Sequence, residues 1–299
     1  MLLKELHDKN LINPPGFVLS NTVYLSISGS LAYGTAQDYS DFDVVGFCIP
    51  PKDLIFPHLA GQIDGFGRQI KKFEQYQQHG IVDPTAMNGK GREYDITVFS
   101  IIKFFQLCMD GNPNCLETIF TPIDCVLHNS VIGNLVRENR KLFLHKGFFP
   151  RAKGYAFAQI SRARSQTRIG KRKELVDKYN FDIKCCAHAV RLLGEAEQVL
   201  VEHDLDLRKN KEQVKSVRNG EWTFEQVNEY FTTKERELET LYLTSTLRHS
   251  PDEEKIKELL LNCLEMHYGS LNKCVKIEGR SDSILREIKR LIDSMESTQ

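Results

Sequence analysis

Apolar and polar residues alternate in short segments of the first hundred residues, as in strands with one buried face. The alternation is clear in residues 23–28 and in residues 93–99, where β-branched and aromatic side chains are frequent. Residues 41–49 form a third apolar segment, and Pro50 and Pro51 follow it; proline cannot continue a central strand. We therefore predict three strands in the front part of the chain.

Helical patterns dominate the rest of the chain. A helix is predicted from Ser100 to about Asp110, with shorter helices at 115–120 and 130–145. After Pro150 nearly all of the chain is expected to be helical. The predicted helices there cover residues 151–170, 181–203, 208–219, 223–245, 251–268 and 281–296.

These elements together predict an α+β fold. A domain with a short mixed β-sheet is expected over residues 1–150, and a mostly helical domain over residues 151–299. Residues 53–92 are rich in Gly, Gln and Lys and weakly periodic, so they are interpreted as an insertion of loops with at most a short helix.

Composition narrows the class of protein. The 299 residues include 40 basic and 40 acidic ones, so any attraction to nucleic acid must come from a local patch. No apolar run approaches the roughly 20 residues that span a bilayer, and the first residues lack a signal-peptide core. A cytoplasmic protein of a cell or a virus, with no membrane partner, is expected. The eight cysteines form no Cys-x-x-Cys pair, which argues against a zinc knuckle.

Two carboxylates stand out in the second predicted strand. Asp41 and Asp43 are two positions apart, so their side chains share one face of the strand, opposite Phe42 and Val44. Like charges held this close repel unless a cation neutralises them, and Mg²⁺ prefers such oxygen ligands. The other interpretation is an ordinary pair of solvated turn or edge-strand residues.

The third predicted strand supplies another carboxylate. Asp95 lies on its polar face with Glu93 and Thr97, and carboxylates on neighbouring strands can hold two metal ions about 3.5–4 Å apart. The long interval between Asp43 and Asp95 leaves Glu93 and Glu117 as alternative third ligands. Two Mg²⁺ ions are expected, with Mn²⁺ as an alternative.

A Gly-Ser turn precedes the carboxylates. Gly29 allows close approach of the backbone to a ligand, and Ser30 offers a hydroxyl and an amide that suit an anion. A nucleoside triphosphate, with ATP favoured, is the expected occupant beside the metal ions.

The stretch "GSLAYG" followed by "SDFDVVGF", with a later strand aspartate, resembles the DNA polymerase β nucleotidyltransferase superfamily. The resemblance is nearest to the nucleotidyltransferases predicted beside RNA-repair enzymes and in large phages. It extends over about residues 23–265 through "FFQLCMDGNPNCLETIF", "KGYAFAQ", "DIKCCAHAVRLL" and "VRNGEWTFEQV". The resemblance implies a palm-like catalytic domain, metal ligands at Asp41, Asp43 and Asp95, and phosphate binding by Gly29 and Ser30.

Further contacts are predicted for the nucleotide. Lys184, His188 and Arg191 fall on one face of a predicted helix, where an anion is expected to oppose them. The alternatives are a helix surface paired with acids and, for His188, a buried histidine. Ser40 and Lys153 complete the set of nucleotide-binding candidates.

Residues 151–173 contain several basic residues, no acid, and two aromatic residues near their start. This pattern predicts a surface that follows an RNA backbone, with Arg162, Arg164, Arg168 and Lys171 as candidate contacts. The alternative is a solvated basic helix with Tyr155 and Phe157 in the core.

The sequence thus predicts a metal-dependent nucleotidyltransferase that moves a nucleoside monophosphate to an acceptor hydroxyl. An RNA 3′ end, such as a tRNA under repair, is the favoured acceptor. Three alternatives stay open: AMP transfer to a tyrosine, serine or threonine of a partner protein, transfer to a small molecule, and nucleotide binding without catalysis. The oligomeric state is not predicted.

Overall fold

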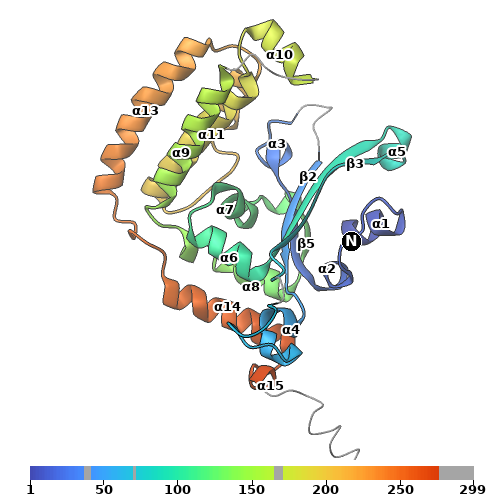
Figure 1. Ribbon diagram of the computed structural model, residues 1–299. Helices are drawn as coiled ribbons and strands as arrows, with labels where there is room; N and C mark the ends of the chain where they lie inside the picture. Colours follow the sequence, from blue (N-terminus) through green and yellow to red (C-terminus); the bar gives the residue numbers. More distant parts are fainter. Residues whose placement is uncertain (37–41, 70–71, 165–170, 276–299) are drawn as a thin grey trace, which may run out of the picture.

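The structure, a computed structural model, describes residues 1–36, 42–69, 72–164 and 171–275 (Figure 1). These residues form an α+β fold around a five-stranded mixed sheet in the order β3-β4-β2-β1-β5. Only β2 and β4 pair in parallel; the other neighbours are antiparallel. The strands are β1 Thr22–Ile27, β2 Phe42–Cys48, β3 Gln75–Asp83, β4 Arg92–Ser100 and β5 Val126–Asn129. The predicted fold class is confirmed.

The three predicted strands correspond to β1, β2 and β4, but β3 and β5 were not predicted. β3 lies inside the segment interpreted as looped insertion, and for residues 75–83 that prediction was wrong. The reason is that β3 is an edge strand whose first residues are polar on both faces and largely exposed. The apolar alternation that reveals a half-buried strand is therefore missing from its sequence.

The two faces of the sheet are covered by different helices (Figure 1). On one face α1 Leu2–Asp8 and α2 Gly16–Asn21 supply side chains to a core with Phe42, Val44 and Ile96. On the other face the larger core includes Phe47, whose ring stacks on Phe104 with centroids 4.5 Å apart. Alternation along β2 thus separates the two cores, as the period of two requires.

Helices that follow β4 build the second layer. Ser100 precedes α6 Ile101–Met109, and its side chain caps the helix by accepting a hydrogen bond from the Lys103 amide. α7 Pro113–Phe120 and α8 Val131–Glu138 complete this part. The short helices of the chain are α3 Gly29–Ala32, α4 Lys52–Ile55, η1 Pro57–Ala60, α5 Ala86–Gly89, η2 Ile123–Cys125 and η3 Arg140–Phe143.

The back of the chain is helical as predicted, and α11 Ile183–Glu202 is its centre. This helix is almost wholly buried and packs on α9 Phe148–Ala163, α12 Lys211–Arg218 and α13 Phe224–Thr244. The remaining helices are α10 Lys171–Tyr179, α14 Glu253–Tyr268 and α15 Asn272–Val275. The helix predicted at 281–296 lies outside the described residues.

One hydrophobic core joins residues from both sides of position 150, from Val23 to Leu264. The division into domains 1–150 and 151–299 stays a prediction. All eight cysteines lie within the described residues, and all are buried free thiols, in keeping with a packing role. Within the described ranges, no helix combines the length and apolar character that crossing a bilayer requires.

The centre of the sheet depends on a glycine. A Cβ at Gly46 of β2 would lie 2.1 Å from the backbone carbonyl oxygen of Tyr24 in β1. Because backbone cannot yield as a side chain does, we expect Gly46→Ala to lower the free energy of unfolding by at least about 2 kcal/mol. Urea unfolding measures the change. Gly16→Ala is the control, since a Cβ there meets nothing within 4 Å; equal stabilities of the two variants would contradict the prediction.

Candidate active site

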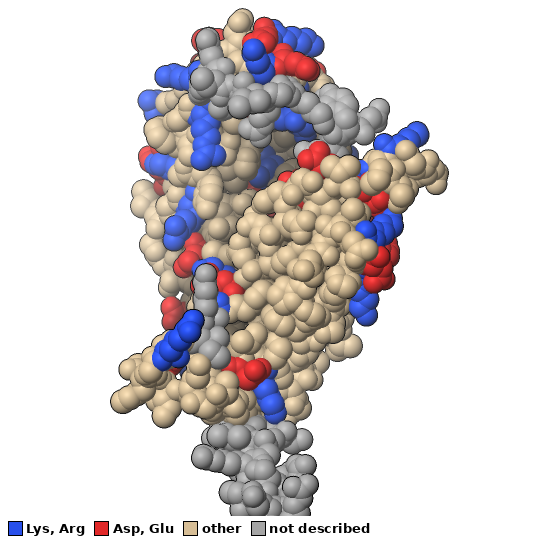
Figure 2. Space-filling model, turned by 45° about the vertical axis from the view of Figure 1, so that its right-hand side comes forward, with Lys and Arg blue, Asp and Glu red and all other residues tan. Residues whose placement is uncertain are grey.

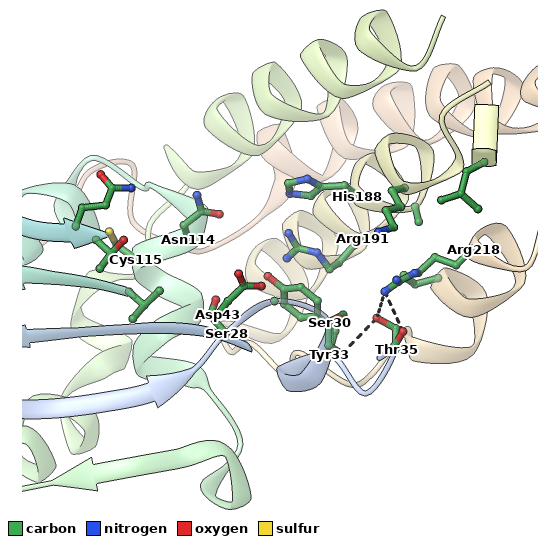
Figure 3. Close-up of a pocket in the computed structure, with 18 of the residues that line it drawn as sticks. Ser28, Ser30, Tyr33, Thr35, Asp43, Asn114, Cys115, His188, Arg191 and Arg218 are labelled. Atoms are coloured by element: carbon green, nitrogen blue, oxygen red, sulfur yellow. Dashed lines mark hydrogen bonds between the residues drawn. The ribbon is translucent and has the colours of Figure 1, made fainter. Parts of the chain in front are cut away.

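A cavity of about 910 Å³ lies between the sheet and α11 (Figure 3). Its lining comes from β2, β3 and β4, from the turn after β1, and from α7, α10, α11 and α12. Its volume is at the upper end of the range for small-molecule sites. On the face shown in Figure 2, Lys and Arg side chains gather in the upper, helical part, above a broad surface that carries few charges.

The turn after β1 brings the backbone against a carboxylate. Gly29 has φ +66°, and a Cβ there would lie 2.2 Å from Oδ2 of Asp43. Only glycine therefore permits this approach, which explains the residue type at the start of the motif. Gly29, Ser30 and Asp43 all line the cavity (Figure 3). Ser40 and Asp41 lie outside the described residues.

Asp43 and Asp95 are direct partners in the parallel pairing of β2 and β4. In-register neighbours on adjacent strands point to the same face of the sheet. Both carboxylates therefore lie on the face that carries the cavity, but Asp43 belongs to the cavity lining and Asp95 does not. Each leans to a different side: Asp43 lies against the Gly29 turn, and Asp95 interacts with β3. The backbone register thus sets these two positions side by side, and their roles as metal ligands stay predictions.

A β-bulge in β3 holds the side chain of Asp95. The register shifts between Gln78 and Ile81, so His79 and Gly80 stand opposite Asp95. The Gly80 amide donates to Oδ1 of Asp95 at 2.8 Å, and Nδ1 of His79 lies 3.4 Å from Oδ2. These contacts were not predicted, although a glycine inside a strand, here Gly80 after His79, is a recognisable bulge signal.

The predicted basic face of α11 borders the cavity. Lys184, His188 and Arg191 all belong to its lining, as does Asp43 on the opposite wall (Figure 3). For Arg191 the alternative of pairing with acids applies, because the guanidinium is buried and ion-paired. The roles of Lys184 and His188 in nucleotide binding stay predictions.

Arg191 lies at the centre of a buried ionic network. Its Nη1 donates to Oε1 of Glu117 at 2.5 Å and to Oε1 of Glu195 at 2.6 Å. The guanidinium carbon lies 4.0 Å from the ring centroid of Tyr33, whose hydroxyl donates to Oε2 of Glu117. The Glu117 side chain is only 2% exposed and both of its oxygens are engaged inside this network, whereas the Asp95 side chain is 34% exposed. Burial therefore argues against Glu117 as a third metal ligand.

The Glu195 carboxyl has a raised pKa in this network. Burial raises the pKa of its carboxyl well above the usual range, and the Arg191 guanidinium offsets only part of the effect. Within the described part of the chain, its Oε2 is buried without a hydrogen-bond partner. One cation between two buried carboxylates leaves an excess negative charge, which a proton on Glu195 removes.

Other cavity residues were not predicted. Arg218 of α12 donates from Nη1 to the carbonyl oxygen of Thr35 at 2.9 Å and to its hydroxyl at 3.2 Å, which ties the segment after α3 to the helical part (Figure 3). Arg218 belongs to the "VRNGEWTFEQV" stretch, which was the available signal. Asn114 also lines the cavity, at the N-terminus of α7.

Some predicted residues lie elsewhere. Lys153 does not line the cavity; it forms ion pairs with Glu235 at 2.7 Å and Glu239 at 2.8 Å on α13. These hydrogen bonds raise its pKa and favour a structural role. Glu93 is exposed on β4 and, like Asp95, is absent from the cavity lining.

The basic surface is described only in part. Arg162 and Arg164 are exposed near the end of α9, and the Arg164 guanidinium lies 5.2 Å from the ring centroid of Phe224. Tyr155 and Phe157 are 42% and 62% exposed, so the alternative of a core role for them is wrong. Arg168 lies outside the described residues, and Lys171 begins α10.

The described acidic side chains offer few ligands for a metal ion. Among the described residues, no group of three His, Cys, Asp or Glu side chains is arranged to hold one. Asp43 and Asp95 nevertheless present carboxylate oxygens, the ligands that Mg²⁺ prefers, on one face of neighbouring strands. The Gly29 turn, a cradle that any Cβ would fill, adjoins them. These residues fit a hard divalent cation.

Comparison with known proteins gives two matches. The model of the RNA repair pathway DNA polymerase beta family matches residues 3–262. An uncharacterized 38.9 kDa protein of the nrdC-mobD intergenic region of Enterobacteria phage T4 is 26% identical over 125 residues. That match covers 41% of this chain and 33% of the phage protein, so the chain spans about a third of that relative.

The contact between Gly29 and Asp43 leads to the first test of the cavity. We expect Gly29→Ala to displace the Asp43 carboxylate and to weaken the affinity for ATP and Mg²⁺ at least about tenfold, because the Cβ occupies its place. Calorimetric titration measures the affinity. Gly34→Ala is the matched control: it has the same φ of +66°, but its Cβ meets nothing closer than 3.7 Å. Equal losses in both variants would show that backbone strain alone acts.

Glu195 makes stability depend on pH. Because its pKa is higher in the folded protein than the value of 4.5 expected for the unfolded chain, the folded state binds this proton more tightly. The resulting stabilisation is present below that value and is lost as pH rises through the folded pKa. We expect Glu195→Gln, which cannot titrate, to reduce this fall. Urea unfolding between pH 5 and pH 9 tests it; parallel curves for variant and wild type would contradict the assignment.

Proposed function

The chain belongs to the RNA repair pathway DNA polymerase beta family, and from this premise we propose that it is a metal-dependent nucleotidyltransferase. It transfers a nucleoside monophosphate from a nucleoside triphosphate, with ATP favoured, to an acceptor hydroxyl and releases pyrophosphate. The observation that supports this most directly is the pairing of Asp43 with Asp95 across two parallel strands, beside the Gly29 turn.

Asp43 and Asp95, together with Asp41, are proposed to hold two Mg²⁺ ions, with Mn²⁺ as an alternative. A bound divalent cation would neutralise charge on the triphosphate and lower the pKa of the attacking hydroxyl. These carboxylates would supply hard oxygen ligands, and the position of Asp43 and Asp95 on paired strands favours a fixed geometry.

The other residues of the cavity bind and orient the substrate. Ser30 and the backbone at Gly29 are proposed to receive the triphosphate, with Lys184 and His188 of α11 facing it as cationic or hydrogen-bonding groups. In the reaction, the acceptor oxygen forms a bond to the α-phosphorus, and the bond from that phosphorus to pyrophosphate breaks. The proton of the acceptor hydroxyl passes to a carboxylate oxygen of Asp95.

The favoured acceptor is an RNA 3′ end, such as that of a tRNA under repair. The family is linked to RNA repair by its description. The exposed Arg162 and Arg164 lie at the C-terminal end of α9, and the rings of Tyr155 and Phe157 are exposed on the same helix. They offer cations and stacking faces of the kind that bind single strands. Transfer to protein, transfer to a small molecule, and binding without catalysis are the other outcomes of the assay below.

The assay uses labelled nucleoside triphosphates with Mg²⁺ and follows label into RNA, protein or small molecules. We expect Asp43→Asn and Asp95→Asn each to lower the transfer rate at least about a hundredfold, because each removes a proposed metal ligand. Glu93→Gln is the matched control, since it removes an exposed carboxylate two positions before Asp95 on the same strand.

Transfer that survives in Asp43→Asn would contradict the site assignment. Transfer lost in Glu93→Gln but kept in Asp95→Asn would assign the third carboxylate to Glu93. Circular dichroism and melting of each variant establish that it is folded.

A further inference from the structure

The two ends of the cavity differ in chemistry. In Figure 3, Asn114 lies near the strands, Arg218 and Thr35 lie at the far side, and Asp43 and Ser30 lie between them. At the far side Lys184 and Arg218 also line a smaller adjoining pocket of about 370 Å³, so the two cationic side chains lie at the same end. The other end, here called the sheet end, has uncharged hydrogen-bonding side chains and one aromatic ring. It consists of Gln75, Gln77, Thr97, Phe99 and Asn114.

The sheet end extends directly from Asp95. Gln77 pairs with Thr97 and Gln75 pairs with Phe99 in the antiparallel register of β3 and β4. Thr97 and Phe99 follow Asp95 by two and four positions, so they lie about 7 Å and 13 Å further along the same face. A molecule that reaches Asp95 from this side must lie across these side chains.

Hydrogen bonds link the sheet end to Asp95. Nε2 of Gln75 donates to Oε1 of Gln77 at 2.9 Å, and Nε2 of Gln77 lies 2.6 Å from Nε2 of His79. An amide nitrogen only donates, so Nε2 of His79 accepts and its Nδ1 carries the proton that faces Asp95. The side chains on this face of β3 therefore form a continuous chain that ends on the proposed catalytic carboxylate.

We propose that the sheet end binds the terminal nucleoside of the RNA acceptor and that Gln77 is a specificity-determining contact for its base. This inference rests on the proposed function. An amide side chain presents a donor and an acceptor to a base edge, and the Phe99 ring offers a stacking face. The triphosphate is better matched by the cations at the opposite end.

The side chains of the sheet end can form further hydrogen bonds to a base. One amide hydrogen and one lone pair of the Gln77 side chain are used in the chain of hydrogen bonds, and an amide has two of each. Gln75 and Gln77 are exposed on an edge strand, so a base reaches them without displacing the core.

The test compares Gln77→Leu with the wild-type protein on RNA oligonucleotides that differ only in the 3′-terminal nucleoside. We expect the KM for RNA to rise about tenfold and the preference among the four terminal nucleosides to change, because one hydrogen-bonding contact is lost. The dissociation constant of ATP, measured without RNA, is expected to stay within about twofold. Gln75→Leu serves as a second variant of the same end.

Two further variants serve as controls. Gln78→Leu removes the same amide from the same strand, but this side chain does not line the cavity and donates to the Leu11 carbonyl oxygen instead. It is expected to keep the wild-type nucleoside preference. Lys184→Gln, at the cationic end, is expected to weaken ATP binding and to leave the nucleoside preference unchanged.

The outcomes separate this inference from the function on which it rests. If the wild-type protein labels RNA, and Gln77→Leu and Gln75→Leu weaken ATP binding but keep the nucleoside preference, the sheet end holds the incoming nucleotide and the inference is overturned. It is also overturned if label enters protein but not RNA. A wild-type protein that transfers label to no acceptor overturns the proposed function and the inference together.

Discussion

The parallel pairing of β2 with β4 is the constraint on which the site depends. These strands are distant in sequence, and their register sets Asp43 beside Asp95 while it directs Phe42, Val44, Tyr94 and Ile96 into the opposite core. A slip of one residue in either strand would exchange the two faces and bury a carboxylate among apolar side chains. The hydrophobic core under the sheet therefore fixes the position of the charged pair above it. One register of β2 and β4 determines both the packing of this core and the placement of the proposed metal ligands.

The buried network around Arg191 joins the two walls of the cavity. Glu117 comes from α7, Tyr33 follows the Gly29 turn, and Arg191 and Glu195 come from α11. Removing one partner of a buried ion pair leaves an uncompensated charge, typically at a cost of about 3–5 kcal/mol. The helical wall therefore resists displacement relative to the turn. Such rigidity suits a site in which carboxylates from the sheet and cations from the helices are proposed to act on one triphosphate.

The edge strand β3 supplies exposed polar side chains and a bulge, which the central strands lack. Its bulge directs the Gly80 amide and the His79 ring to Asp95, and its polar face continues as the amide-lined end of the cavity. A central strand, covered on both faces and paired on both sides, has little room for such exposed polar side chains, whereas an edge strand tolerates them. The division of the cavity into a cationic end and an amide end follows from this arrangement of an edge strand opposite a helix.

Residue order alone determined the strands that carry the carboxylates, the glycine at the turn, the basic face of α11 and most helices, because these depend on periodicity and on local backbone preferences. Tertiary structure alone decided the partners. In the fold, Arg191 forms ion pairs with Glu117 and Glu195, and Lys153 forms ion pairs with α13. Phe157 is exposed, and β3 and Arg218 line the cavity. The physical reason is that a charged side chain accepts any opposite charge within a few ångströms, and only the path of the chain decides which of the 40 acidic residues comes that close.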